Sequence, residues 1–145
     1  MPTPPVLTHE EVATRLRVAV NRLQRRLRQQ SLDGLSPAQA SALGTINRLG
    51  RPTLGELAAI EQVQPPSMTR IVANLARAGM VTREVDSDDR RSVRVQITPV
   101  GARALERMRT MKNAFLLRRL GDLSADEQRH AEELVALLEH LLDEP

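Results

Sequence analysis

The chain has 145 residues and a formal net charge of +3; 41% of its residues are hydrophobic, none is Cys, and Phe115 is the single aromatic residue. This length suits one domain over residues 1–145 and leaves little room for a separate catalytic module. The lack of Cys excludes disulfides, thiolate zinc sites and thiol redox sensors. No apolar run approaches the roughly 18 residues that a membrane span needs, so we expect a cytoplasmic protein without membrane contact.

Charge is distributed unevenly along the chain. Residues 15–28 contain six Arg and no acidic residue, whereas residues 120–145 contain eight acidic residues and one Arg. A chain with this pattern presents one basic and one acidic surface. The plain alternative is that both segments are solvated helix faces.

Helix starts can be read directly from the sequence, because Ser or Thr followed three residues later by Glu or Gln caps a first turn reciprocally. The capping pairs are Thr8 with Glu11, Ser36 with Gln39, Thr53 with Glu56, and Ser124 with Glu127. They predict helices over residues 8–30, 36–49, 53–60 and 124–143. Thr98, followed by proline, starts a further helix over 98–119. Gln64 precedes two prolines and starts one over 65–78, since proline is tolerated in a first turn.

The first and the last expected helices carry apolar surface that one small lobe cannot cover. The stripe on the first helix consists of Val12, Leu16, Val20, Leu23 and Leu27, and the last helix is apolar over much of residues 131–142. Burying apolar surface contributes on the order of 25 cal/mol per Å². We therefore expect residues 8–30 and 98–143 to be dimerisation helices, which cover each other in a homodimer.

After Gly79 the apolar period changes from helical to two. Val93, Val95 and Ile97 alternate with polar residues, which is typical of a strand with one buried face. Residues 81–85 can pair with them antiparallel, and the polar residues 86–92 suit the loop between the two strands. Three short helices followed by such a hairpin give the order of a winged helix-turn-helix lobe, here over residues 36–97.

The helix expected over 65–78 has an outward face whose groups suit DNA. The face consists of Ser67, Arg70, Asn74 and Arg77, flanked by Gln64 and Thr69. Arg can bind guanine through two acceptors, Asn can bind adenine, and a helix N-terminus attracts phosphate. Residues 62–83 contain no carboxylate that phosphates would repel. A solvated amphipathic helix is the alternative interpretation of this segment.

Two arginines lie at the expected tip of the hairpin. Arg90 or Arg91 could enter a narrow minor groove, where the negative potential is enhanced. Asp89 beside them could hold an Arg side chain in its working rotamer through a paired hydrogen bond. The alternative is a plain turn of mixed charge.

Together these segments resemble the multiple antibiotic resistance regulator (MarR) family, over about residues 8–143. The most specific matches are residues 54–58, 67–75, 79–83 and 89–101. The resemblance implies a mainly α protein with a small two- or three-stranded antiparallel wing. It also implies a triangular dimer in which the first and last two helices form the base. The helix over 65–78 would read the major groove and the wing would touch the minor groove.

The resemblance also implies roles for single residues and a mode of regulation. Ser67, Thr69 and Arg70 become the main base readers, Asn74 and Arg77 backbone contacts, and Arg91, steadied by Asp89, the wing arginine; Arg90 joins the wing set. The expected function is a repressor on a roughly palindromic operator, with half-sites about 10 base pairs apart. Many relatives release DNA when a small aromatic or lipophilic effector enters a crevice. Here that crevice is expected to draw on apolar residues from the first, second and fifth helices.

Two other classes of function compete with this interpretation. An enzyme is disfavoured, because His9, His130 and His140 suggest no catalytic or metal-binding set; the last two lie about 280° apart around a helix. We accordingly expect no cofactor. The second alternative is a helical protein-interaction module that does not bind DNA, in which the acidic C-terminal helix binds a partner.

Overall fold

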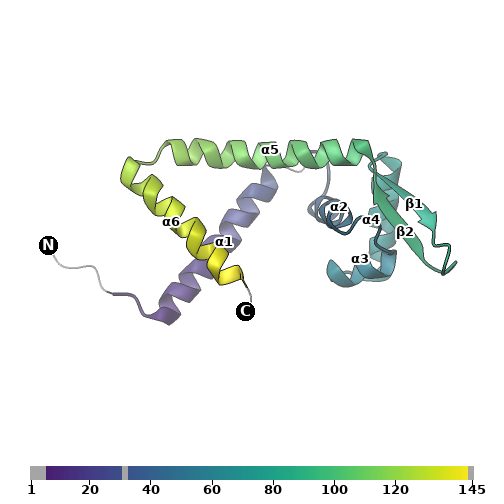
Figure 1. Cartoon of the computed structure of the whole chain (residues 1–145), viewed down its shortest axis with the longest axis horizontal. Helices are drawn as coiled ribbons and strands as arrows, with labels where there is room; N and C mark the ends of the chain where they lie inside the picture. The colour runs from purple at the N-terminus through teal and green to yellow at the C-terminus, as the bar shows by residue number, and fades with distance from the viewer. Residues whose placement is uncertain (1–5, 31–32, 144–145) are drawn as a thin grey trace.

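A computed structural model describes residues 6–30 and 33–143 of the chain. The elements are α1 (His9–Gln29), α2 (Pro37–Leu49), α3 (Leu54–Ile60), α4 (Pro65–Arg77), β1 (Val81–Val85), β2 (Val93–Ile97), α5 (Pro99–Gly121) and α6 (Ala125–Leu142). The long α5 spans the molecule (Figure 1). α2, α3, α4 and the two strands gather at its beginning, and α6 folds back from its end. The predicted mainly α fold with a small antiparallel wing is confirmed.

All four predicted capping boxes are formed. In each, the Ser or Thr side chain accepts from the backbone N–H three residues on, and the Glu or Gln side chain accepts from the N-cap N–H. These contacts satisfy amides that have no partner within the helix. They explain why helix starts can be predicted to within a residue.

The hydrophobic core lies in the lobe at the beginning of α5. Its fully buried side chains are Leu43, Ile46, Leu57, Met68, Val72, Leu75 and Val95. The first turns of α5 add Ala104, Leu105 and Met108 to it. Leu49 at the end of α2 is 41% exposed, because α2 ends there and the chain turns away at Gly50 (φ 84°).

The helices α1 and α6, both within the described part of the chain, bury no residue inside the protomer. The exposed apolar residues on them include Val12, Val20, Leu23, Leu134, Leu137 and Leu141. Their predicted apolar stripes are therefore present and uncovered. No described helix is long and apolar enough to cross a membrane.

The sheet has two antiparallel strands, with Val81 opposite Ile97 and Val85 opposite Val93. The third strand that the sequence allowed is reduced to a single bridge between Thr53 and Arg94. Beside it, the Val95 N–H donates to the Pro52 carbonyl over 2.9 Å. The hairpin is thus joined to the turn between α2 and α3.

The junction between the lobe and α5 is tight. Thr98 donates its hydroxyl to the Gly79 carbonyl over 2.6 Å and its N–H to the Met80 carbonyl over 2.9 Å. A Cβ at Gly101 would lie 2.2 Å from that Met80 oxygen, so only glycine allows this approach. The direction of α5 is therefore fixed relative to the turn that follows α4.

Candidate nucleic-acid interface

The helix α4 has a buried face on the side opposite its predicted outward face. Met68, Val72 and Leu75 are fully buried, and Ile71 is partly buried. The side chains predicted to read DNA lie on the other side: Gln64, Ser67, Thr69, Arg70 and Arg77 are exposed, and Asn74 is half-buried. The structure thus brings the predicted reading residues together on one helix face.

The polar groups at the start of α4 differ in what they can still donate. Gln64 is the N-cap, but its side-chain amide makes no capping hydrogen bond to α4. Thr69 donates its hydroxyl to the Pro65 carbonyl over 3.0 Å. Thr69 therefore offers an acceptor oxygen and a methyl group, and a methyl group can pack against the methyl of thymine.

The arginines of α4 are available for an external partner. Within the described residues, no ion pair involves Arg70 or Arg77. A guanidinium without an internal carboxylate keeps all five N–H donors for a base or a phosphate. The two arginines can therefore bind a polyanion without first breaking an ion pair to a described residue.

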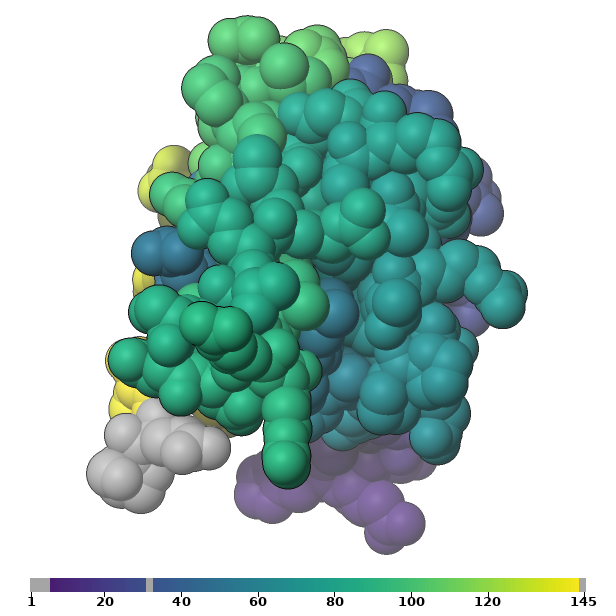
Figure 2. Space-filling model, turned by 90° about the vertical axis from the view of Figure 1, so that its right-hand side faces the viewer, coloured from purple at the N-terminus to yellow at the C-terminus, as the bar shows by residue number. Residues whose placement is uncertain are grey.

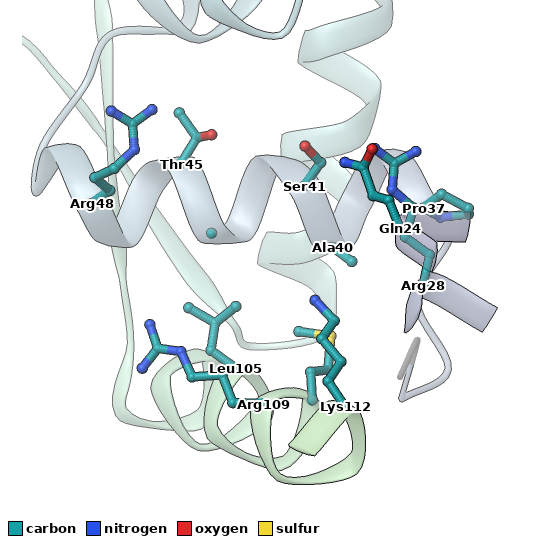
Figure 3. Close-up of a pocket in the computed structure, with 12 residues that line it drawn as sticks. Gln24, Arg28, Pro37, Ala40, Ser41, Thr45, Arg48, Leu105, Arg109 and Lys112 are labelled. Carbon is teal, nitrogen blue, oxygen red and sulfur yellow. The ribbon is translucent and has the colours of Figure 1, made fainter. Parts of the chain in front are cut away.

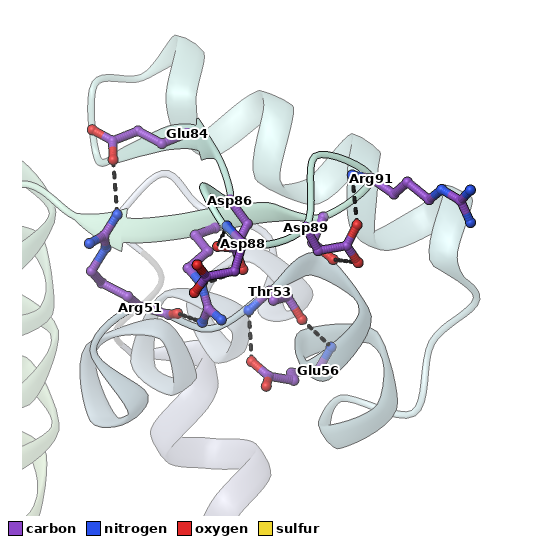
Figure 4. Close-up of polar contacts among 10 residues, drawn as sticks. Arg51, Thr53, Glu56, Glu84, Asp86, Asp88, Asp89 and Arg91 are labelled. Carbon is purple, nitrogen blue, oxygen red and sulfur yellow. Dashed lines mark hydrogen bonds and ion pairs between the residues drawn. The ribbon is translucent and has the colours of Figure 1, made fainter.

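The tip of the wing is built differently from the expected arginine-carboxylate pair. The Asp89 carboxylate accepts the backbone N–H of Arg91 over 3.0 Å and the hydroxyl of Ser92 over 3.3 Å. Figure 4 shows the Arg91 side chain extending away from this contact. The expectation that Asp89 holds the Arg91 side chain is wrong: Asp89 holds the loop backbone, because its short side chain closes an Asx turn there.

Two cationic residues that the sequence analysis did not assign connect the wing to the rest of the lobe. Arg94 donates to the Asp86 carboxylate and to the Arg51 carbonyl, each over 2.9 Å. The Arg51 side chain pairs with Glu84 over 2.9 Å. No local motif could have revealed these contacts, because the partners Arg51 and Arg94 lie 43 residues apart.

The reading helix and the wing lie on the same side of the molecule. Figure 2 looks onto the end that carries the lobe, where teal side chains of α3 and α4 and greener side chains of the hairpin share one face. A duplex that lies on this face can meet both elements at once.

A helix with an outward cationic face beside an arginine-tipped hairpin, on a winged helix-turn-helix lobe, defines a winged-helix DNA-binding protein. Comparison with known proteins identifies the family within this class. The family model for the MarR family matches residues 35–93. The chain is 38% identical to an HTH-type transcriptional regulator of Mycobacterium leprae, over 92% of this chain and 94% of that protein. The chain belongs to the MarR family and is a DNA-binding transcriptional regulator.

Solved structures agree with this assignment. A transcriptional regulator from Pseudomonas aeruginosa is 30% identical, with a TM-score of 0.77 over 92% of this chain and 97% of that one. The apo form of MarR from Escherichia coli is 27% identical, with a TM-score of 0.73 over 96% of this chain and all of that one. The fold thus matches the family over nearly its whole length.

Proposed function

We propose that the protein is a homodimeric repressor that reads a roughly palindromic operator and acts by binding, without catalysis. The observation that carries the proposal is the cationic face of α4, which has no ion-pair partner among the described residues and lies beside the wing tip. Two copies related by a twofold axis would present two reading helices to successive major grooves, about 10 base pairs apart. Residues 36–97 form the reading lobe, and residues 8–30 and 98–143 form the dimer base.

Base recognition is assigned to the first turns of α4. Arg70 is long enough to reach guanine O6 and N7, while Ser67 and Thr69 contact base edges nearer the helix start. Asn74 and Arg77, further along α4, contact the phosphate backbone, and Gln64 supplies a donor at the helix start. This division predicts that changes at the start of α4 alter sequence preference, whereas changes at its end alter affinity.

The wing supplies contacts of a less specific kind. Arg91 enters the minor groove, and Arg90 lies beside it on the same exposed loop. Asp89 contributes indirectly, since it holds the Arg91 backbone in the Asx turn. A structure of the same fold, the Staphylococcus aureus MepR F27L mutant, is bound to an oligodeoxyribonucleotide.

A small-molecule effector could act at a pocket of about 340 Å³ between α1, α2 and α5. Its lining combines apolar residues of α2 and α5 with cationic side chains. Among the described residues, Arg28, Arg48, Arg109 and Lys112 border it, no acidic side chain does, and Leu105 and Met108 supply the main apolar contacts. Figure 3 shows Arg109 and Lys112 rising from α5 toward α2. The effector should therefore combine an acidic group with a small aromatic or lipophilic body.

Such an effector releases DNA only if it prefers one separation of the two reading helices. The pocket is placed for this effect, because it lies between the reading lobe and the helices of the dimer base. Effector binding would then shift the dimer toward a spacing that no longer matches the operator.

Selection of bound duplexes from a random DNA pool tests the proposed function. A twofold-symmetric motif with half-sites about 10 base pairs apart is the expected result. Mobility shifts with the recovered sequence at two salt concentrations then separate the two classes of function. Several phosphate contacts make affinity fall steeply as salt rises. A protein-interaction module would recover no motif and show no salt-dependent binding, and that outcome would overturn the proposal.

A further inference from the structure

The wing loop, residues 86–92, lies beyond the last pair of the strand ladder, Val85 with Val93. Its direction is therefore not set by the sheet alone, and a two-stranded hairpin is by itself only marginally stable in water. Two backbone hydrogen bonds form within the loop: the Asp86 N–H donates to the Ser92 carbonyl and the Ser92 N–H donates to the Asp89 carbonyl, each over 2.9 Å. Neither bond joins the loop to the rest of the lobe, so a restraint of that kind is supplied by side chains.

Arg94 supplies such a restraint. Its Nε donates to Asp86 Oδ2 and its Nη1 donates to the Arg51 carbonyl, each over 2.9 Å. One planar guanidinium thus joins the first residue of the wing loop to the turn between α2 and α3. Because guanidinium geometry is rigid, two bonds in different directions define the position of Asp86 relative to the lobe.

The partner of Arg94 is well placed to transmit this restraint. The Asp86 side chain is only 10% exposed, and its carboxylate also accepts the Asp88 N–H over 3.1 Å. That N–H is the main reason that the pKa of Asp86 is lowered, and Arg94 lowers it further. The Asp86 carboxylate is thus held from the loop side and from the strand side together.

The neighbouring ion pair cannot restrain the loop in the same way. Arg51 and Glu84 are 54% and 67% exposed in their side chains, and a pair that exposed in water contributes little. Arg94 is less exposed, at 36%, and has a nearly buried partner. Of these two arginines, Arg94 is the one whose contacts can fix the wing.

We propose that Arg94 is a positioning residue for DNA binding. By bonding to Asp86 and to the Arg51 carbonyl, it fixes the position of the wing loop so that Arg91 and α4 contact the same duplex. In this role Arg94 acts through its contacts within the protein and not through a contact with the DNA. The inference rests on the proposed function, in which Arg91 contacts the duplex.

A double-mutant cycle on DNA binding tests this role. The variants are R94M, which keeps a side chain of similar length without donors, R91A, and the double variant. Affinity is measured on the duplex recovered by selection. R94M should weaken binding. The fold loss of affinity caused by R91A should be smaller by a factor of about three or more in the R94M background, because a displaced wing already makes little contact with the DNA. The proposal would be contradicted if R94M bound at the wild-type level, or if the affinity loss of the double variant equalled the product of the two single losses.

The controls separate positioning from charge loss and from misfolding. R83M removes an arginine from the exposed side of β1, so R91A should keep its full penalty in that background. D86N removes the partner charge, so it should weaken binding as R94M does, and adding R94M to it should cost little more. Thermal unfolding of each variant shows whether the lobe is folded. If wild type binds no duplex at all, the proposed function fails; if wild type binds and the cycle is additive, only the role of Arg94 fails.

Discussion

Arg70 and Arg91 carry the same charge in different surroundings. Arg70 lies on a rigid helix whose opposite face is fully buried, so its guanidinium can be held in register with one base pair. Arg91 lies on an exposed loop, where its side chain projects from an Asx turn. A contact from a rigid element discriminates between bases, whereas a contact to the backbone or to groove shape tolerates many sequences.

Arg70→Ala should weaken binding to the cognate duplex by about 1 to 3 kcal/mol and weaken binding to random DNA much less. The reason is that a base contact is lost while most phosphate contacts remain. Competition mobility shifts with the two duplexes measure the difference. Equal losses on both duplexes would remove Arg70 from base reading.

Arg91→Ala should lower affinity for cognate and random duplexes by a similar factor, because the wing contributes chiefly through charge and groove shape. The same competition assay measures this. Arg118→Ala is the control for charge loss, since Arg118 is exposed near the end of α5 that lies away from α4 in Figure 1. A wild-type affinity for the Arg91 variant would exclude the wing from binding.

Gly101 is required by a close approach at the start of α5. A Cβ there would lie 2.2 Å from the Met80 carbonyl and 2.8 Å from the Ile97 side chain. Gly101→Ala should therefore destabilise the fold by about 1 to 3 kcal/mol, measured by denaturant unfolding. Gly121→Ala is the matched control on the same helix, because a Cβ there would meet no described atom within 4 Å and alanine favours a helix. A Gly101 variant as stable as the control would show that α5 can shift without cost.

At the scale of elements, features that depend on residues close in the sequence could be predicted better than contacts between residues far apart in it. Helix starts depend on pairs three residues apart, so Thr8, Ser36, Thr53 and Ser124 could be placed from sequence. The outward face of α4 follows from the helical period. The contact of Arg94 with the Arg51 carbonyl could not be predicted, because the two residues lie 43 positions apart. Nothing in the local sequence distinguishes this carbonyl from the other acceptors that an arginine could bind.

The capping boxes of α1 and α6 predict an acid-sensitive contribution to stability. The Ser124 N–H, followed by its hydroxyl, holds the pKa of Glu127 below its ordinary value of 4.5, and Thr8 lowers the pKa of Glu11 in the same way. A carboxyl group whose pKa is lowered by folding stabilises the folded state above its ordinary pKa. That contribution is lost as the pH falls through the lower, folded value.

Glu127→Gln should therefore be less stable than wild type at pH 7, and the difference should shrink as the pH falls below 4.5. The amide keeps the shape of the capping box but has no charge to titrate. Thermal unfolding between pH 7 and pH 3, at one protein concentration, measures the difference. Glu133→Gln, an exposed change in the middle of α6, is the control. A difference that stays constant with pH would mean that Glu127 acts without its charge.

At the scale of the whole molecule, the core and the uncovered apolar surface lie in different places. In the described part of the chain, the buried residues belong to the lobe and the first turns of α5, whereas α1 and α6 bury none. Because α5 joins these two parts as one helix, a change in how the base helices pack would move the lobe with it (Figure 1). In the proposed dimer, the same arrangement would make the spacing of the two reading helices depend on the dimer base.

Leu137→Glu should convert the proposed dimer to a monomer, because it places a charge on the α6 face formed by Leu134, Leu137 and Leu141, which are 48%, 55% and 61% exposed in the protomer. Sedimentation equilibrium measures the association state, and mobility shifts compare a full operator with a single half-site. Affinity for the full operator should fall to about the level of the half-site, since two lobes no longer bind as one unit. Ala136→Glu adds the same charge on another side of α6 and should leave both unchanged. If the Leu137 variant stays dimeric, or if it is monomeric and keeps full operator affinity, then binding to both half-sites does not depend on this face of α6.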